Sequence, residues 1–207
     1  MKDFSLNKKI ACFLLMMNLL LTSCSMDRKA SVDWKADWIG VSQENQPNSW
    51  YCFRNEIELR KSPKLAIAKI ACDSKYWLWV NDEMVVFEGQ LKRGPNPRDT
   101  YYDEVDLTEF LKKGKNNIAV LSWYWGRHGF AHNSSGKAGL IFDANIDGKS
   151  YAGDPSWKVK LHPAYSSTSK PHPNWRLAEP NIKFDAQKES SFFTLFSISL
   201  IRYSLSR

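Results

Sequence analysis

The chain is 207 residues long, with 43% hydrophobic and 25% charged residues, and this balance excludes an intrinsically disordered protein. The formal net charge is +7, but the basic residues are spread along the chain rather than gathered in a run rich in Lys and Arg. Nucleic acid is therefore not expected as a partner.

The first 23 residues have the pattern of an export signal rather than of a folded element. Lysines at positions 2, 8 and 9 precede an apolar run at 10–21. This run is shorter than the roughly 20 residues that a membrane-spanning helix needs. The sequence LTSC that ends at Cys24 resembles a bacterial lipobox, in which cleavage precedes the cysteine and the cysteine is lipidated. We therefore predict a lipoprotein signal peptide at residues 1–23; the alternative is a plain signal peptide with a chance cysteine.

Lipidation of Cys24 would place the exported protein on the cell envelope, at the periplasmic or cell surface side, with the lipid membrane as a partner. The remaining chain is long enough for one domain, placed at residues 24–189, before an atypical tail at residues 190–207. Cys52 and Cys72 lie in expected strands, so a disulfide and two buried thiols both stay open. No CxxC pair occurs, which excludes a zinc site of that type.

Strand patterns dominate the first half of the domain. Residues 50–59 predict one strand, and residues 65–73 are nearly all apolar, as in a central strand buried on both faces. Residues 76–80 alternate, with Trp77 and Trp79 on one face and the residues between and around them on the other.

Turn signals punctuate the rest of the domain. Asn81-Asp82 and Asp147-Gly148 suit two-residue hairpin turns. Asp106 is expected to cap a short helical turn, with Glu109 in the capping-box position. Further strands are predicted at 84–87, 117–125, 138–146, 149–152 and 157–161, and surface loop is expected from Pro163 onward. Many short strands with almost no helix predict an all-β sandwich.

Residues 73–126 carry a resemblance to a known family. The segments DSKYWLWVNDEMVV and YYDEVDLTEFLKKGKNNIAV, followed by the ending WYWG, are similar to the N-terminal jelly-roll domain of bacterial α-L-rhamnosidases. The resemblance extends over roughly residues 34–189 and implies a jelly-roll, galactose-binding-like β-sandwich. Where the wider superfold has a glycine after Asn81, this chain has Asp82, which a turn accepts.

The rhamnosidases that the segment resembles hydrolyse terminal α-L-rhamnose with inversion, using acidic residues of a separate helical barrel. Inversion needs a carboxylic acid and a carboxylate about 6.5–9.5 Å apart, with room for water. No segment of this chain resembles that barrel, so the resemblance carries over no catalytic residue and predicts that the chain alone is no hydrolase.

The expected function is therefore that of an ancillary, carbohydrate-binding domain, truncated before a catalytic barrel that normally lies in cis. Rhamnose-containing polysaccharide or oligosaccharide is the expected partner. Two alternatives are a stand-alone glycan-binding lipoprotein and a purely structural docking module. The tail SSFFTLFSISLIRYSLSR has no acidic residue and no regular period, so we interpret it as a lost reading frame near Glu189; the alternative is a genuine terminal strand.

One group of aromatic and basic residues is a candidate sugar site, because sugars stack their apolar faces on flat rings while a few polar groups fix their orientation. The candidates are Trp123, Tyr124, Trp125, Arg127 and His128, joined by Lys92 and Arg93 from another loop. The alternative is that the tryptophans are core residues or a docking surface for the barrel, since large aromatics are usually mostly buried.

No metal or other cofactor is expected to be needed. The acidic residues from Asp103 to Glu109 are interpreted as the start of a turn, where acids cap free N–H groups. A structural calcium ion bound partly by these carboxylates stays open, although no DxDxDG loop occurs. His128 and His132 lie four residues apart, but in a glycine-containing loop and without an HExxH pattern, so no zinc site is expected.

Overall fold

The computed structural model describes residues 33–40, 46–90, 101–129, 132–152, 156–168 and 181–189. The signal peptide with Cys24, the loop residues Lys92 and Arg93, and the tail at 190–207 lie outside the described residues, so the predictions made for them stay predictions. The compact unit that contains all the sheets is Trp34–Arg207. In the described part of the chain, no helix is long and apolar enough to cross a membrane.

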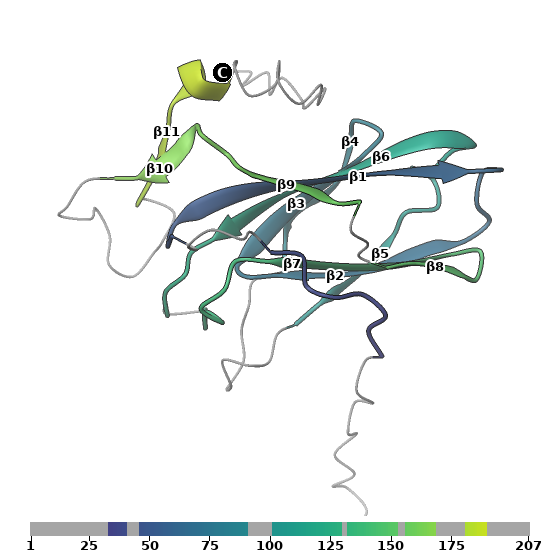
Figure 1. Ribbon diagram of the computed structural model, residues 1–207, viewed down its shortest axis with the longest axis horizontal. Coiled ribbons are helices and arrows are strands. Elements are labelled where there is room, and N and C mark those ends of the chain that lie inside the picture. Colours follow the sequence, from purple (N-terminus) through teal and green to yellow (C-terminus); the bar gives the residue numbers. More distant parts are fainter. Residues whose placement is uncertain are drawn as a thin grey trace, which may run out of the picture. The chain divides into compact units, whose positions relative to one another are not determined.

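Two antiparallel sheets lie face to face, and a short hairpin adjoins the first of them (Figure 1). The first sheet contains, in spatial order, β4 (Glu83–Gly89), β3 (Lys75–Val80), β6 (Gly114–Tyr124), β1 (Ser49–Leu59) and β9 (Lys158–Leu161). The second contains β5 (Asp103–Asp106), β2 (Ala66–Cys72), β7 (Leu140–Ile146) and β8 (Lys149–Ala152). The hairpin pairs β10 (Tyr165–Ser167) with β11 (Ile182–Phe184). The predicted all-β sandwich is confirmed.

Alternate side chains of both sheets fill the space between them, which we call the inner core. Because successive residues of a strand point to opposite faces, one strand contributes every second side chain. The first sheet contributes, among others, Phe53, Tyr76, Leu78, Ile118 and Val120, and the second contributes Ala68, Ile70 and Phe142. The apolar run at 65–73 is the central strand that its composition predicts, because β2 lies between β5 and β7.

Both predicted hairpin turns are present. Asn81 and Asp82 have φ values of 50° and 69°, and Asp147 and Gly148 have values of 49° and 84°. Two successive residues with positive φ are typical of the tight turn whose twist matches that of paired strands. Asn81 also ties its turn to the segment that contains Phe110, because its Nδ2 donates to Phe110 O at 2.8 Å.

One local expectation differs from the structure. The chain beyond Pro163 is not loop alone, since it contains β10 and β11, which pair with each other. The short turn predicted after Asp106 is present, because Leu111 N donates to Leu107 O at 3.2 Å, and Asp106 caps it: its Oδ1 accepts a hydrogen bond from Thr108 N at 2.9 Å. Hydrogen bonds from Thr108 lower the pKa of the Asp106 carboxyl.

Cys52 and Cys72 are both free and buried, which decides between the two alternatives left open by the sequence. Cys52 lies in β1 of the first sheet and Cys72 in β2 of the second. Burial raises the pKa of both thiols, so they behave as small apolar residues rather than as nucleophiles.

Candidate functional site

Tryptophans gather on the outer face of the first sheet, which points away from the inner core. The buried members of this cluster are Trp50, Trp77, Trp79, Ala119 and Trp123, and Met84 and Leu121 pack against them. We call this cluster the tryptophan face. Within this cluster, Trp50 stacks on Trp77 at 5.0 Å and on Trp123 at 5.7 Å between ring centroids.

Strand register explains why residues far apart in the sequence meet on this face. Trp79 pairs with Ala119, and Trp123 pairs with Trp50 across β6 and β1. Paired residues of antiparallel strands point to the same face, so the alternation predicted for 76–80 extends over the neighbouring strands. Trp77 and Trp79 do share one face, as the sequence predicts.

The β10–β11 hairpin lies against one side of the tryptophan face. Tyr165 of β10 stacks on Trp50 at 4.2 Å between ring centroids. Asn48 ties the hairpin to the sheet, because its Oδ1 accepts from Trp123 Nε1 at 2.9 Å while its Nδ2 donates to Ser167 Oγ at 2.8 Å and to Asn181 O at 3.0 Å. One buried amide thus connects an indole to β10 and to the residue that precedes β11.

The structure separates the predicted sugar-binding residues into two groups. Trp123 and Tyr124 are each only 2% exposed; Trp123 belongs to the tryptophan face and Tyr124 to the inner core. Trp125 is partly buried, and Arg127 lies over its ring, with Cζ 5.5 Å from the centroid. His128 is exposed next to them in sequence. We call Trp125, Arg127 and His128 the rim cluster, since these predicted residues keep surface at the end of β6.

Hydrogen bonds to Asp73 and Ser74 hold the loop that carries the rim cluster. Ser74 Oγ accepts from Trp125 N at 3.0 Å and lies 3.0 Å from His132 Nε2. The Asp73 carboxylate accepts from Ser135 Oγ at 2.6 Å. Burial alone would raise the pKa of Asp73, but its hydrogen bonds from His132 and Ser135 outweigh burial and lower it. Sequence reasoning missed this role of His132, for which no local pattern exists.

Ser74, His132 and Asp73 resemble a hydrolytic triad by residue type but not by geometry. In a working triad the histidine uses one ring nitrogen for the serine and the other for the aspartate. Here Nε2 faces both partners, at 3.0 Å from Ser74 Oγ and 3.2 Å from Asp73 Oδ1. All three residues are also buried, so a substrate has no access to the serine. Asp73, Ser74 and His132 therefore position the loop that carries the rim cluster.

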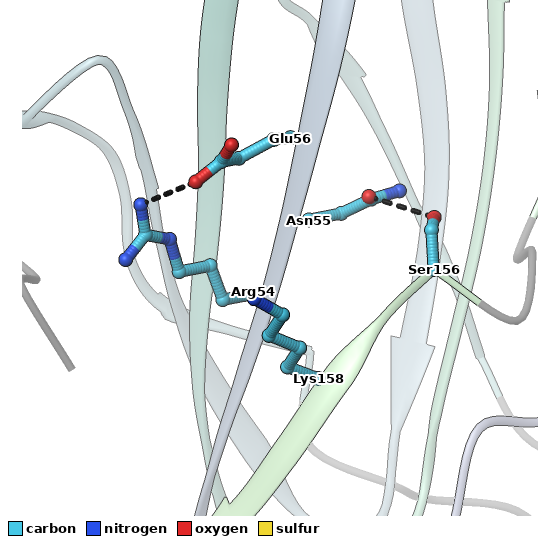
Figure 2. Close-up of a pocket in the computed structure, with 5 residues that line it drawn as sticks. All are labelled: Arg54, Asn55, Glu56, Ser156 and Lys158. Atoms are coloured by element: carbon cyan, nitrogen blue, oxygen red, sulfur yellow. Dashed lines mark hydrogen bonds and ion pairs between the residues drawn. The ribbon is translucent and has the colours of Figure 1, made fainter.

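A small polar pocket lies beside β1, where β9 begins (Figure 2). Its volume is about 100 Å³, and it is lined by Arg54, Asn55, Glu56, Ser156 and Lys158. Arg54 Nη2 donates to Glu56 Oε1 at 2.6 Å, and Ser156 Oγ donates to Asn55 Oδ1 at 2.9 Å. Small-molecule sites usually measure about 300–1,000 Å³, so the pocket is too small for a sugar ring.

A larger, open hollow lies at the end of the sandwich opposite the rim cluster, between the β1–β2 connection and the β7–β8 hairpin. It measures about 520 Å³ and includes Tyr151 and Asp147. The ring of Tyr151 is covered by Lys149, whose Nζ lies 4.7 Å from the ring centroid. Asp147 is engaged as well, because its Oδ1 accepts from Lys64 N at 2.8 Å.

Two residues of the acidic group at 103–109, Asp103 and Asp106, have structural partners. Asp103 Oδ2 accepts from Tyr76 Oη at 2.8 Å and from Gln90 N at 2.9 Å, which joins β5 to β3. Among the described residues, no three His, Cys, Asp or Glu side chains gather as a ligand set for a metal. The calcium ion left open by the sequence therefore gains no support from the described part of the chain.

Comparison with solved structures identifies the fold. The chain matches the GH78 family rhamnosidase of Bacillus sp. GL1 with a TM-score of 0.59 and 33% identity, over 65% of this chain and 14% of that enzyme. It matches the α-L-rhamnosidase from Dictyoglumus thermophilum with a TM-score of 0.50 and 22% identity, over 63% of this chain and 17% of that one. No family model matches, and no curated protein matches.

This chain resembles the β-sandwich of an α-L-rhamnosidase. The resemblance inferred from residues 73–126 is thereby confirmed. The rhamnosidase-like sandwich spans about one seventh of the length of the enzymes that it matches, so their activity does not transfer to it as a finding. What the sandwich shares with them is the fold, and any binding residues have to be argued from its own surface.

Proposed function

We propose that this rhamnosidase-like sandwich is an ancillary domain that binds a rhamnose-containing polysaccharide or oligosaccharide for a catalytic barrel acting beside it. The observation that carries the proposal is the 33% identity to a GH78 family rhamnosidase over 65% of this chain. Since the match covers only 14% of that enzyme, the domain is assigned binding rather than hydrolysis.

The rim cluster is the surface best suited to a sugar. Trp125 offers a partly buried ring, and Arg127 and His128 offer exposed polar groups beside it. A partly buried indole presents a rigid flat platform at low entropic cost, and neighbouring donors fix the hydroxyl groups of a ring stacked on it. The Asp73 hydrogen bonds keep the loop in place before a ligand arrives, which reduces the cost of ordering it.

The test is calorimetric titration of the full chain with a rhamnose-containing oligosaccharide. Trp125→Ala is expected to weaken binding about tenfold, which corresponds to about 1.4 kcal/mol, because the stacking platform is removed. Arg127→Ala is expected to weaken it about threefold, through one lost exposed polar contact. Tyr151→Ala, in the hollow at the opposite end, is the matched control and should leave the affinity unchanged.

Melting temperature separates binding from folding, because a ligand that binds the native state raises it. Equal affinities of Trp125→Ala and the unaltered chain would remove the rim cluster as the site. Loss of binding in Tyr151→Ala alone would move the site to the hollow. A folded chain that binds no rhamnose-containing glycan would overturn the proposal.

The second candidate is a structural module on which the barrel docks. The burial of Trp123 and Tyr124 removes two of the residues predicted to bind sugar from the surface, which weakens the sugar site but does not itself form a docking surface. Absence of glycan binding, together with stable association of the sandwich with a separately expressed rhamnosidase barrel, would favour this function.

We also propose that Cys24 anchors the exported protein to the cell envelope through lipid. The support is the LTSC sequence at the end of an apolar run. Cys24→Ser is expected to move the protein from the membrane fraction to the soluble fraction, and mass spectrometry of the unaltered protein should show acyl chains on Cys24. An unmodified Cys24 would refute this anchor.

A further inference from the structure

Trp38 is the most exposed tryptophan in the described part of the chain. Its side chain is 51% exposed, whereas Trp125 is partly buried and the tryptophans of the tryptophan face are at most 9% exposed. Tryptophan is highly buried on average, because its ring is large and apolar. A single exposed apolar residue is nevertheless ordinary on a protein surface. The exposure of Trp38 therefore gains meaning only from the way in which its ring is held.

Gly139 is the residue on which the ring of Trp38 lies. A Cβ atom added at Gly139 would stand 3.2 Å from Trp38 Cε3 and 3.9 Å from Trp38 Cζ3, so the missing side chain lets the indole rest directly on the backbone. About half of the Trp38 surface stays in water in this position. A flat ring that is supported from below and open to solvent is the kind of surface on which the apolar face of a sugar stacks.

Backbone hydrogen bonds hold the segment that carries Trp38. Ile39 N donates to Leu140 O at 2.7 Å, and Leu140 N donates to Ile39 O at 2.9 Å. On the other side of Trp38, Lys35 N donates to Asp143 Oδ2 at 2.9 Å. The ring is thus positioned from both sides before a ligand arrives, which lowers the entropic cost of binding.

One loop joins Gly139 to the rim cluster. The connection from β6 to β7 begins with the residues of the rim cluster and ends at Gly139, directly before Leu140 opens β7. Asp73 holds this connection through its hydrogen bond from Ser135 Oγ. Trp38 and the rim cluster therefore lie at the same end of the sandwich, where β6 ends and β7 begins.

We propose that Trp38 is a second sugar-stacking platform, which gives the domain contact with a glycan of several sugar units rather than with one terminal sugar. Exposed polar side chains accompany the ring: Asp37 precedes it in the chain, and Lys137 lies two residues before Gly139. They supply an acceptor and a donor for sugar hydroxyl groups. Trp38 acts on the glycan assigned above, so this role rests on the proposed function, although its residues lie outside the rim cluster.

Heteronuclear NMR titration of the full chain with a rhamnose-containing oligosaccharide observes the two platforms separately, because each indole N–H gives its own signal. Trp38→Phe and Trp125→Phe assign the two signals by removing one each. Both signals are expected to shift and to saturate. The signal of Trp157, which is buried in the inner core, is the internal control and should not move. In Trp125→Ala the Trp38 signal is still expected to shift.

The possible outcomes distinguish this role from the proposed function. A shifting Trp125 signal beside an unmoved Trp38 signal would overturn the Trp38 platform and leave the proposed function intact. A shift of Trp38 alone would support the Trp38 platform and remove the rim cluster. Absence of any shift and of any binding would overturn both. A Trp38 signal that moves only when a separately expressed rhamnosidase barrel is added would assign the ring to protein docking and overturn the sugar platform.

Gly139→Ala tests the support beneath the ring. The added methyl group would lie 3.2 Å from Trp38 Cε3 and 3.3 Å from Ile39 O, closer than ordinary van der Waals contact, so the ring has to shift. The affinity measured from the Trp38 signal is expected to fall about threefold, because the ring is no longer preorganised, while the affinity measured from Trp125 stays the same.

Gly40→Ala is the matched control for this variant. Its added methyl group would lie 3.6 Å from Ala138 O, which is an ordinary contact, and it does not meet the ring of Trp38. The affinity measured from the Trp38 signal should therefore be unchanged. The melting temperature of each variant shows that it is folded. Equal affinities at Trp38 in folded Gly139→Ala and Gly40→Ala would contradict a platform that depends on Gly139.

Discussion

The inner core and the tryptophan face use the same strands but bury their side chains in different ways. Tyr76, Leu78 and Val80 of β3 enter the inner core, where the second sheet covers them. Trp77 and Trp79 of the same strand lie on the opposite face. The inner core closes when two regular sheets meet, whereas the tryptophan face depends on a hairpin of two three-residue strands tied by one asparagine.

This difference shows that alternation in a strand fixes where a side chain points but not what covers it. Most inner-core residues gain stability from apolar contact, which needs no directed bond, and Tyr76 is an exception that also donates to Asp103. The tryptophan face combines stacked rings with polar links, of which the bond from Trp123 to Asn48 is one. Changes in the inner core should therefore act through volume, and changes near the hairpin should act through hydrogen bonds and charge.

Phe142→Ala should have the largest effect. Phe142 is 2% exposed and lies against Trp157, with ring centroids 5.3 Å apart. Its truncation leaves a cavity between the sheets, which should lower the free energy of unfolding by about 3–5 kcal/mol in urea titration. Phe87→Ala is the matched control, because Phe87 is 65% exposed and meets Trp77 only by its edge, at 6.4 Å between centroids.

The Phe87 control should lose less than about 1 kcal/mol, since one edge contact between rings is worth about 0.5–1.5 kcal/mol and little surface is buried. Similar losses for the two variants would contradict the view that the inner core carries most of the stability of the sandwich.

Local patterns in the sequence were enough to predict most of the fold. The run at 65–73, the alternation at 76–80 and the turns at Asn81 and Asp147 each follow from neighbouring residues, and the structure contains all four. β10 and β11 could not be predicted in this way. Each has three residues, and their pairing depends on a partner that lies far along the chain, with no turn signal that joins them.

The candidate site was predicted less well, because burial of an aromatic residue depends on register. Trp123, Tyr124 and Trp125 are adjacent in sequence, and nothing local distinguishes the one that keeps exposed surface. Pairing of β6 with β1 sets Trp123 against Trp50, and alternation then turns Tyr124 into the inner core. The sequence does show that Trp77 and Trp79 share one face of their strand and that Ala119 and Trp123 share one face of theirs. The register that brings these two faces together is set by the tertiary structure and cannot be inferred from local sequence.

Acidification should loosen the connection to the hairpin before it affects the inner core. His162 lies between β9 and β10, and its backbone N–H donates to the backbone carbonyl of Trp50 at 2.7 Å. Burial lowers the pKa of His162 to about 4, whereas an unfolded histidine titrates near 6.5. The unfolded chain therefore binds this proton first. The stability from neutral His162 is fully present above pH 6.5 and is lost as the pH falls from about 6.5 to 4.

The expected loss over this window is about 3 kcal/mol, at 1.36 kcal/mol for each unit of difference in pKa. Urea unfolding at intervals from pH 7 to pH 4 measures it. His162→Gln, which keeps an acceptor for the Ala164 N–H but does not titrate, should flatten the curve in this window. His128→Gln is the control at an exposed histidine and should retain the slope. An unchanged slope in His162→Gln would assign the pH dependence to other groups.

Asn48→Gly should give the smallest of the three losses and the most specific one. Its amide makes three hydrogen bonds that connect Trp123, Ser167 and Asn181, and its φ is 58°. Asn48→Gly accepts that backbone conformation at little cost but removes the bonds, so the free energy of unfolding should fall by about 2 kcal/mol. Asn48→Ala should cost about 1 kcal/mol more, because alanine is strained at positive φ.

The pair of Asn48 variants therefore separates side-chain bonding from backbone strain at one position. If Asn48→Gly loses its bonds, tryptophan emission should also shift to longer wavelength, since the hairpin that carries Tyr165 is released from Trp50. A loss below about 0.5 kcal/mol would fall under the usual worth of even one hydrogen bond. The tryptophan face would then be held mainly by apolar contact, as the inner core is, and the two regions would differ only in the segment that covers each of them.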